Sequence, residues 1–433
     1  MSDPELDLII NKVENEQKSF LKKEALDTSN QPLKIVSRND EVEKIIRYVL
    51  GYKEGHVVPL VSIYGRSGTG KSTLVRHVCN YLPEIKLCFA NIRKAKTVFG
   101  VVNLILNELD QPSLKSAQGM NLGMEKIRDA ILDMMRLEKK KLFVLTLDEF
   151  DVIFYDRRGN PSDFVYKLVE MLAELKKENC LAMIITISNN VLTDYNLDDR
   201  IKSRIGNSEI FFKPYSNNQI LEILQQRAKQ AFGKKIDHEI LEKCAEISFL
   251  ENGDARRAVD LLRVSAEIAA QENKAITIDY VTAASQKIQK DRVEEVLESL
   301  SYHSKMICLF LAAKTFYSEK LWHTTNSTYE KYKKYLELKA VSYRRFSELL
   351  KDLENTGLLV SNTSSKGQKG YSSEFKLVVQ PELIGNLIDK KWWKKQVVDP
   401  KATLNTLNSG KIGKNDPIYK AYLEAKASAN ELW

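Results

Sequence analysis

The sequence has few cysteines and no long apolar run, and both absences narrow the class of protein. Its five cysteines are scattered among 433 residues with no C-x-x-C pair and no Cys/His spacing, which argues against a zinc site and a disulfide framework. The longest apolar runs, such as the one around 308–313, fall far short of the roughly 20 residues that cross a bilayer. The N-terminal residues lack the charged and apolar regions of a signal peptide. We therefore expect a protein of the reducing cytoplasm with no membrane partner.

The basic charge is concentrated in the last third of the chain. Residues 301–433 carry 22 Lys and Arg against 13 Asp and Glu, a net charge of +9. Residues 1–300 carry 44 against 45, a net charge of −1. Such asymmetry predicts a polyanionic partner for the C-terminal part alone, with a merely soluble basic surface as the alternative.

Short apolar runs alternate with helical patterns from residue 57 onward. They are rich in Val, Ile and Leu without polar alternation, which is typical of parallel strands buried on both faces. The runs cover 57–64, 85–90, 142–147, 181–187 and 209–212. From residue 216 the strands stop and apolar residues recur at i, i+3 and i+4, which predicts a small helical domain.

The segment from Gly65 to Ser72, GRSGTGKS, matches G-x-x-x-x-G-K-[ST] between a predicted strand and an apolar-periodic helix. Glycines let consecutive N–H groups face phosphate oxygens, and the helix start adds its positive dipole end. Lys71 is expected to reach the β- and γ-phosphates, and Ser72 to complete the shell of Mg²⁺. The predicted nucleotide ligands are Gly65, Arg66, Ser67, Gly68, Thr69, Gly70, Lys71, Ser72 and Thr73.

Two acids end the apolar strand at 142–147. Asp148 is predicted to orient Mg²⁺ or its waters, and Glu149 to polarise the attacking water of a nucleotide hydrolase. Asn189 follows another strand and is a candidate for positioning that water, although Asn and Ser clusters also simply end strands. Arg256 opens a helix of the small domain, where it either folds back onto the phosphates or stays exposed.

Together these residues resemble the AAA+ ATPases of the initiator clade, in particular the archaeal origin recognition complex subunit one / cell division control protein six family. The resemblance covers roughly residues 33–380 and rests on segments in family order. These are LDEFD (147–151), TISNN (186–190), LDDRIKSRIG (197–206), FKPYS (212–216) and GDARRAVDLL (253–262). It implies that Asn189 is the first sensor of nucleotide state and Arg256 the second.

The resemblance also implies further ligands of the nucleotide. Ile35, Val36 and Arg38 correspond to the segment that contacts adenine, with Tyr215 nearby, although the proline of the family's VPR-like segment is missing here. The arginine finger, which completes a neighbouring subunit's site, is Arg204 or alternatively Arg200. The helices expected between 91 and 141 resemble the initiator insertion that touches DNA, and a solvated charged loop with Arg93, Lys94 and Lys96 is the alternative.

Residues 301–378 have the order helix, helix, helix, hairpin, which is typical of a winged helix. In the third helix (342–357), Ser342 is the predicted N-cap and the buried stripe consists of Phe346, Leu349, Leu350 and Leu353. The predicted DNA-binding residues are Tyr343, Arg344, Arg345, Ser347, Lys351, Lys366, Gln368 and Lys369. Arg344 and Arg345 contact either guanine edges or only phosphates, and a protein-binding winged helix is the alternative.

The predicted fold is therefore an α/β AAA+ P-loop ATPase, with a parallel sheet and a helical lid, followed by an α+β winged-helix domain. The expected domains are a polar, loosely held N-terminal segment (1–33), an AAA+ base (34–215) with a helical insertion near 93–125, a lid (216–295), a winged helix (296–389) and a C-terminal extension (390–433). In that extension Trp392 and Trp393 either stack on nucleic acid or pack in a core, and packing is the favoured interpretation.

The resemblance implies an ATP-dependent replication initiator with ATP or ADP and Mg²⁺ as ligands. Its ATPase would be slow and regulatory, and its partners would be double-stranded origin DNA, the replicative helicase and other initiator subunits on DNA. Its location would be the cytoplasm, in association with the nucleoid. The alternatives are a STAND-type ATPase acting as a winged-helix transcriptional regulator and a clamp-loader-like assembly subunit.

Overall fold

Two compact units make up the chain in the computed structural model, and they divide between Ala284 and Ser285. The structure describes residues 20–28, 30, 34–95, 97–156, 159–195, 198, 202, 208–233, 235–251, 253–318, 321–365 and 371–398. Among these residues, no helix is both long and apolar enough to cross a bilayer.

The first unit is built on a five-stranded parallel sheet, as predicted. Its strands are β1 (Leu60–Gly65), β2 (Ile85–Asn91), β3 (Leu142–Asp148), β4 (Ala182–Ser188) and β5 (Glu209–Phe212). They lie in the order β2-β3-β4-β1-β5. Strands β3 and β4 are buried along their whole length, which explains their unbroken apolar sequences.

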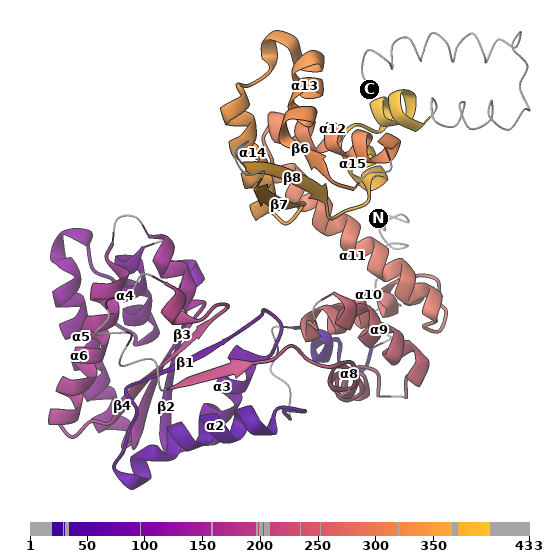
Figure 1. Ribbon diagram of the computed structural model, residues 1–433. Helices are drawn as coiled ribbons and strands as arrows, with labels where there is room; N and C mark the ends of the chain where they lie inside the picture. Colours follow the sequence, from indigo (N-terminus) through magenta and orange to yellow (C-terminus); the bar gives the residue numbers. More distant parts are fainter. Residues whose placement is uncertain are drawn as a thin grey trace, which may run out of the picture. The chain divides into compact units, whose positions relative to one another are not determined.

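Helices cover both faces of this sheet (Figure 1). The helices are α2 (Asn39–Leu50), α3 (Lys71–Tyr81), α4 (Val98–Glu108), α5 (Gly119–Glu138) and α6 (Pro161–Lys177). One apolar core joins the sheet to α4, α5 and α6, and a second joins the other face to α2 and α3. Helices α4 and α5 are the two predicted between the second and third strands, and both bury an apolar stripe in the first of these cores.

A helical lid follows the sheet within the same unit. It contains α8 (Asn217–Phe232), α9 (His238–Leu250) and α10 (Ala255–Gln271). Helix α11 (Ile278–Ser299) begins in this unit and runs past Ala284 into the second. Ser216 begins α8 with a capping box, because its side chain accepts the N–H of Gln219 while the Gln219 side chain accepts the N–H of Ser216. Helix α11 is continuous across residue 295, where the sequence places a domain boundary.

The N-terminal segment corrects one expectation. Residues 20–28 are not a loosely held linker, because the 3-10 helix η1 (Lys23–Leu26) packs against α8 and Leu26 is completely buried. The contact could not be predicted, because the few apolar residues of this segment lie isolated among polar ones.

The second unit contains a winged helix, as predicted. Its elements are α12 (Tyr302–Ser318), β6 (His323–Thr324), α13 (Thr325–Leu336), α14 (Tyr343–Asn355), β7 (Leu359–Ser365), β8 (Tyr371–Leu377) and α15 (Pro381–Trp393). The three strands pair antiparallel in the order β6-β8-β7, and the two-residue β6 is too short to be predicted from the sequence. Ser342 caps α14 by accepting the N–H of Arg345, and all four predicted stripe residues of α14 are buried.

The C-terminal extension expected from residue 390 begins inside this unit. Helix α15 bends at Asp389, whose φ of −152° is not helical, and continues to Trp393 and the π-helix η9 (Lys394–Val398). The Trp393 side chain is 1% exposed, and its ring lies 5.6 Å from that of Phe316, so core packing is confirmed for this residue.

Candidate functional site

The phosphate loop joins β1 to α3 in the first unit. Gly68 and Gly70 have φ values of 75° and 87°, a left-handed conformation that glycine adopts without strain. The Lys71 ammonium donates to the carbonyl oxygens of Gly65 at 2.6 Å and Arg66 at 2.9 Å, so it lies inside the loop. Burial lowers the pKa of Lys71 to about 8, while the Asp148 carboxylate acts in the opposite direction. A phosphate anion at this position would favour the charged ammonium.

The two acids lie beside this loop because all five strands end at the same edge of the sheet. The Ser72 hydroxyl donates to Asp148 Oδ1 at 3.0 Å, and the Glu149 N–H donates to the same oxygen at 3.0 Å. Burial raises the pKa of Asp148, and these two hydrogen bonds oppose the shift. Strand β4 lies between β1 and β3, so Asn189, just after β4, lines one pocket with Lys71 and both acids.

Arg93 forms an ion pair with Glu149 that the sequence analysis missed. Arg93 Nη1 lies 3.1 Å from Glu149 Oε2. The register explains the contact, because Asn91 at the end of β2 pairs with Asp148 at the end of β3. A basic residue just after the second strand is therefore the sequence signal that could have revealed this partner. The contact shows that Arg93 faces the acids from the start of the helical insertion.

The lid touches the phosphate loop through the start of α10. The Ala255 N–H donates to the Gly68 carbonyl at 3.3 Å, and a Cβ on Gly68 would lie only 1.8 Å from Asp254 Oδ1. Asp254 caps α10 by accepting the N–H of Arg256 at 2.8 Å. Arg256 therefore lines the pocket that holds both acids, and in the described part of the chain no hydrogen bond or ion pair engages its side chain. The structure thus brings the two predicted sensors, Asn189 and Arg256, into one pocket.

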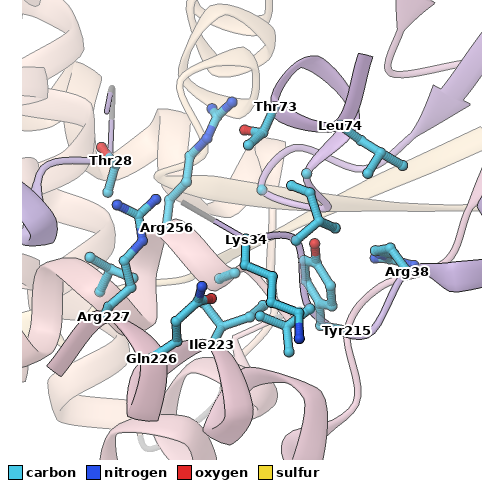
Figure 2. Close-up of a pocket in the computed structure, with 16 residues that line it drawn as sticks. Thr28, Lys34, Arg38, Thr73, Leu74, Tyr215, Ile223, Gln226, Arg227 and Arg256 are labelled. Carbon is cyan, nitrogen blue, oxygen red and sulfur yellow. The ribbon is translucent and has the colours of Figure 1, made fainter. Parts of the chain in front are cut away.

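A second pocket extends from the loop along the lid (Figure 2). Among the predicted residues it is lined by Ile35, Val36, Arg38, Gly68, Gly70, Thr73, Tyr215 and Arg256. The sequence analysis missed the remaining lining residues, which are Thr28, Lys34, Leu74, Ile223, Gln226, Arg227, Ala255 and Val259. Ile223 and Val259 are apolar residues at helical spacing, which predicts that they are buried. The spacing does not distinguish a ligand pocket from the lid core as the place where they are buried.

Arg38 joins the phosphate loop to the segment before the lid. Its guanidinium donates to the carbonyls of Thr69 at 3.1 Å and Lys213 at 2.7 Å, and lies 3.9 Å from the centre of the Tyr215 ring. The preceding residue, Ser37, has a φ of 60°, which proline cannot adopt. A proline at position 37 would therefore require a different backbone conformation here.

Five predicted site residues lie outside the described residues. They are the two arginine-finger candidates, Arg200 and Arg204, and the wing residues Lys366, Gln368 and Lys369. Their roles stay predictions.

Helix α14, the third helix of the predicted winged helix, presents a polar face to solvent. The side chains of Arg344 and Arg345 are 92% and 54% exposed, and both pair with Glu348, at 3.5 and 2.9 Å. The Arg345 hydrogen bond lowers the pKa of Glu348. Tyr343 and Lys351 are also exposed, while Ser347 is half-buried and donates to the Tyr343 carbonyl. Glu348, which the sequence analysis missed, adds an acceptor to this basic face.

A phosphate loop, two acids at the neighbouring strand end, a lid that touches the loop and a winged helix together define an AAA+ ATPase of the winged-helix type. The family model for AAA ATPases matches residues 61–211. Two further family models match the rest: the Cdc6 AAA+ ATPase-type lid domain over 221–286, and the CDC6 C-terminal winged helix domain over 295–386.

Similar proteins point to one family. The chain is 30% identical over 403 residues to an ORC1-type DNA replication protein of Thermococcus onnurineus, covering 89% of this chain and 95% of that protein. It is 29% identical to an ORC1-type DNA replication protein 1 of Sulfolobus acidocaldarius, covering 82% and 88%. The Aeropyrum pernix ORC1 protein, solved in complex with DNA, is similar with a TM-score of 0.69 and 26% identity, over 88% of this chain and 98% of that one. The chain belongs to the ORC1-type DNA replication proteins.

The Arg93 ion pair leads to a prediction about turnover. Replacing Arg93 with Ala is expected to raise steady-state ATP hydrolysis about two- to five-fold, because Glu149 no longer spends time bound to a guanidinium and an exposed ion pair contributes about 0.2–1 kcal/mol. Phosphate release in the full chain measures the effect. Lys94→Ala, one residue away, is the control and should leave turnover unchanged. A slower Arg93→Ala enzyme would mean that Arg93 assists hydrolysis.

Proposed function

We propose that this chain is an ATP-dependent replication initiator that binds double-stranded origin DNA and helps load the replicative helicase. The observation that carries the proposal is the combination, in an ORC1-type chain, of a lid in contact with the phosphate loop and an exposed helix face with Arg344 and Arg345 on a winged helix. The DNA complex of the similar Aeropyrum pernix protein supports it. Association with the nucleoid follows from binding chromosomal DNA.

ATP or ADP occupies the phosphate loop and the adjoining lid pocket in this proposal. Lys71 binds the β- and γ-phosphates, and the loop N–H groups surround them. Ile35, Val36 and Tyr215 line the part of the pocket that takes adenine. Arg38 supports this part indirectly, because its guanidinium holds the loop and Lys213 together.

Mg²⁺ fits the residues beside the loop. The Ser72 hydroxyl and the Asp148 carboxylate lie in hydrogen-bond contact, and hard oxygen ligands of this kind suit Mg²⁺ when phosphate oxygens complete its shell. The ion would neutralise charge on the phosphates. Ser72 and Asp148 are therefore the proposed metal ligands.

Hydrolysis then depends on groups at the strand ends. Glu149 accepts a proton from the attacking water, and Asn189 holds that water in place. Arg256 binds the γ-phosphate. When hydrolysis removes the γ-phosphate, the contact between α10 and the phosphate loop changes. Turnover is slow and regulatory for two reasons. The carboxylate of Glu149 is held in an ion pair with Arg93. In addition, an arginine finger, Arg204 or Arg200, must come from a neighbouring initiator subunit on DNA.

DNA binding is assigned to the winged helix of the second unit and to the helical insertion of the first. Helix α14 enters the major groove with Tyr343, Arg344, Arg345, Ser347 and Lys351 on its exposed side. The wing residues Lys366, Gln368 and Lys369 contact the backbone or minor groove in this proposal. Glu348 adds an acceptor that suits cytosine N4 and orients the two arginines.

Footprinting of the full chain on origin-proximal DNA of its own genome tests the proposal. We expect protection of discrete sites, with log affinity falling against log salt at a slope of about −5 if six phosphates are neutralised. The double variant Arg344→Ala, Arg345→Ala should weaken binding about 100-fold if the arginines read guanine. If they contact only phosphates, it should reduce the slope by about two and weaken all sequences alike.

The matched control is Arg47→Ala. Arg47 is an exposed helical arginine paired with a glutamate, as in α14, but it lies in α2 of the first unit. Its loss should leave DNA affinity unchanged. Protection no better than on random DNA would contradict the initiator proposal. Binding sites centred on promoters rather than origins would favour a transcriptional regulator. Negligible, salt-insensitive DNA binding with retained binding to protein partners would favour an assembly subunit.

A further inference from the structure

A strap of N-terminal residues, defined as 20–28 together with Asn30, is part of the lid. The rings of Phe20 and Phe232 stack with centres 5.3 Å apart, and Leu26 is completely buried. The N–H groups of the two residues after Phe20 both donate to the carbonyl at position 231, at 2.7 and 3.0 Å. The strap therefore packs on α8 through both apolar and backbone contacts.

Arg227 of α8 also binds this strap. Its side chain is buried, with Nη1 donating to the Ala25 carbonyl at 2.9 Å and Nη2 donating to the Asn30 carbonyl at 3.0 Å. Both carbonyls lie about 200 residues away in the sequence. A guanidinium has a rigid planar fork of donors, so one side chain can hold two strap carbonyls in a fixed relation.

The stretch between these two carbonyls reaches the lid pocket. Thr28 lies between Ala25 and Asn30 and lines the pocket together with Arg227. In Figure 2, Thr28 and Arg227 lie to the left of the pocket, and Tyr215 and Arg38 lie to the right. The strap is thus one wall of a pocket whose other walls come from α8, α10 and the phosphate loop.

The lining of this wall suits a nucleoside rather than phosphate. Ile223 and Val259 provide apolar surface, and Thr28 and Gln226 provide a hydroxyl and an amide. Apolar walls with a few polar groups are typical of sites for planar organic ligands. Arg227 also lines this region, but its guanidinium donates hydrogen bonds to the strap. Arg256, by contrast, lines the phosphate pocket as well.

We propose that Arg227 is a positioning residue for the nucleoside half of the ATP site. By holding the carbonyls of Ala25 and Asn30, it places Thr28 against the base and ribose, while the phosphates depend on the loop. The strap then accompanies the lid whenever the lid responds to nucleotide. This role rests on the nucleotide binding proposed above.

Arg227→Leu in the full chain tests the role, with calorimetric titration of ADP and of inorganic tripolyphosphate, which has no base or ribose. We expect about 10-fold weaker ADP binding, the weight of about one well-placed polar contact, and unchanged tripolyphosphate binding. Arg227→Lys keeps the charge but loses the fork, so it should weaken ADP binding by an intermediate factor. It also provides the measurement if the leucine variant does not fold.

Lys243→Leu is the control, because Lys243 is a lid cation whose ion pair, to Glu246, stays within α9. It should leave both affinities unchanged. Equal weakening of ADP and tripolyphosphate by the Arg227 variants would make Arg227 a phosphate ligand and overturn the proposal, and so would unchanged ADP binding. If the wild-type chain binds neither compound, the proposed nucleotide binding itself fails.

Hydrogen exchange separates positioning from simple support of the fold. ADP should slow exchange of the Leu21 and Lys22 amides in the wild-type chain, because a ligand against Thr28 holds the strap on the lid. In Arg227→Leu this protection should be lost. A variant that melts earlier but keeps the wild-type ratio of ADP to tripolyphosphate affinity would contradict the proposal, because Arg227 would then only stabilise the lid.

Discussion

Replacing Glu149 with Gln is expected to lower ATP hydrolysis by about 100- to 10,000-fold while ATP binding is retained. Glutamine has the size of glutamate but cannot accept a proton from water. Binding should persist because the contacts of Lys71, and of Ser72 with Asp148, do not involve the Glu149 side chain. Single-turnover phosphate release and equilibrium ATP binding, both in the full chain, measure the two effects separately.

The matched control is Glu170→Gln, which makes the same chemical change at an exposed position of α6. It should leave both turnover and binding unchanged. Unchanged turnover in Glu149→Gln would refute the role of Glu149 as the base. The double variant Arg93→Ala, Glu149→Gln is a further check. Arg93 acts on turnover through Glu149, so removing its guanidinium should no longer accelerate the reaction once residue 149 is glutamine.

The phosphate loop and the acids could be predicted because short, local patterns determine them. Glycines at fixed spacing dictate the loop between β1 and α3, and an apolar run that ends in Asp148 and Glu149 dictates the edge of β3. A parallel sheet brings strand ends together whatever the intervening sequence. The same reasoning could place Asn189 near the loop once β4 was assigned.

Contacts between distant segments could not be predicted in this way. Arg227 holds carbonyls about 200 residues away, and Arg38 joins Thr69 to Lys213. In the sequence each is one charged residue on an amphipathic helix or loop, and nothing in helical periodicity distinguishes a buried arginine from a solvated one. The strap was missed for the same reason, because Phe20 and Leu26 are isolated apolar residues in a polar stretch.

The packing partners of the residues just beyond 389 were missed for a different reason. The kink at Asp389 and the lysines beyond it suggest a boundary, yet the chain continues into the core. Asp389 accepts the Trp392 N–H at 2.9 Å and so begins a second helical turn. Trp393 then packs on Gly385, where a Cβ would lie only 1.9 Å from the indole ring.

Replacing Trp393 with Ala is therefore expected to destabilise the winged helix by about 3–5 kcal/mol. The side chain is 1% exposed and packs in the apolar core of the second unit. Its removal would therefore leave a large cavity. Urea unfolding followed by hydrogen exchange in α12 and α15 measures the loss for this unit alone. DNA affinity should fall with it, while ATP binding by the first unit should remain.

Two neighbouring changes test whether packing is the cause. Trp392→Ala should cost less, because Trp392 is only half-buried and makes edge contacts with Phe310 and Tyr335. Trp393→Phe should also cost less than Trp393→Ala. Phenylalanine keeps most of the ring and removes an indole N–H that is buried without a hydrogen-bond partner in the described part of the chain. A Trp393→Ala protein with wild-type stability but lost DNA binding would instead mean that Trp393 stacks on nucleic acid.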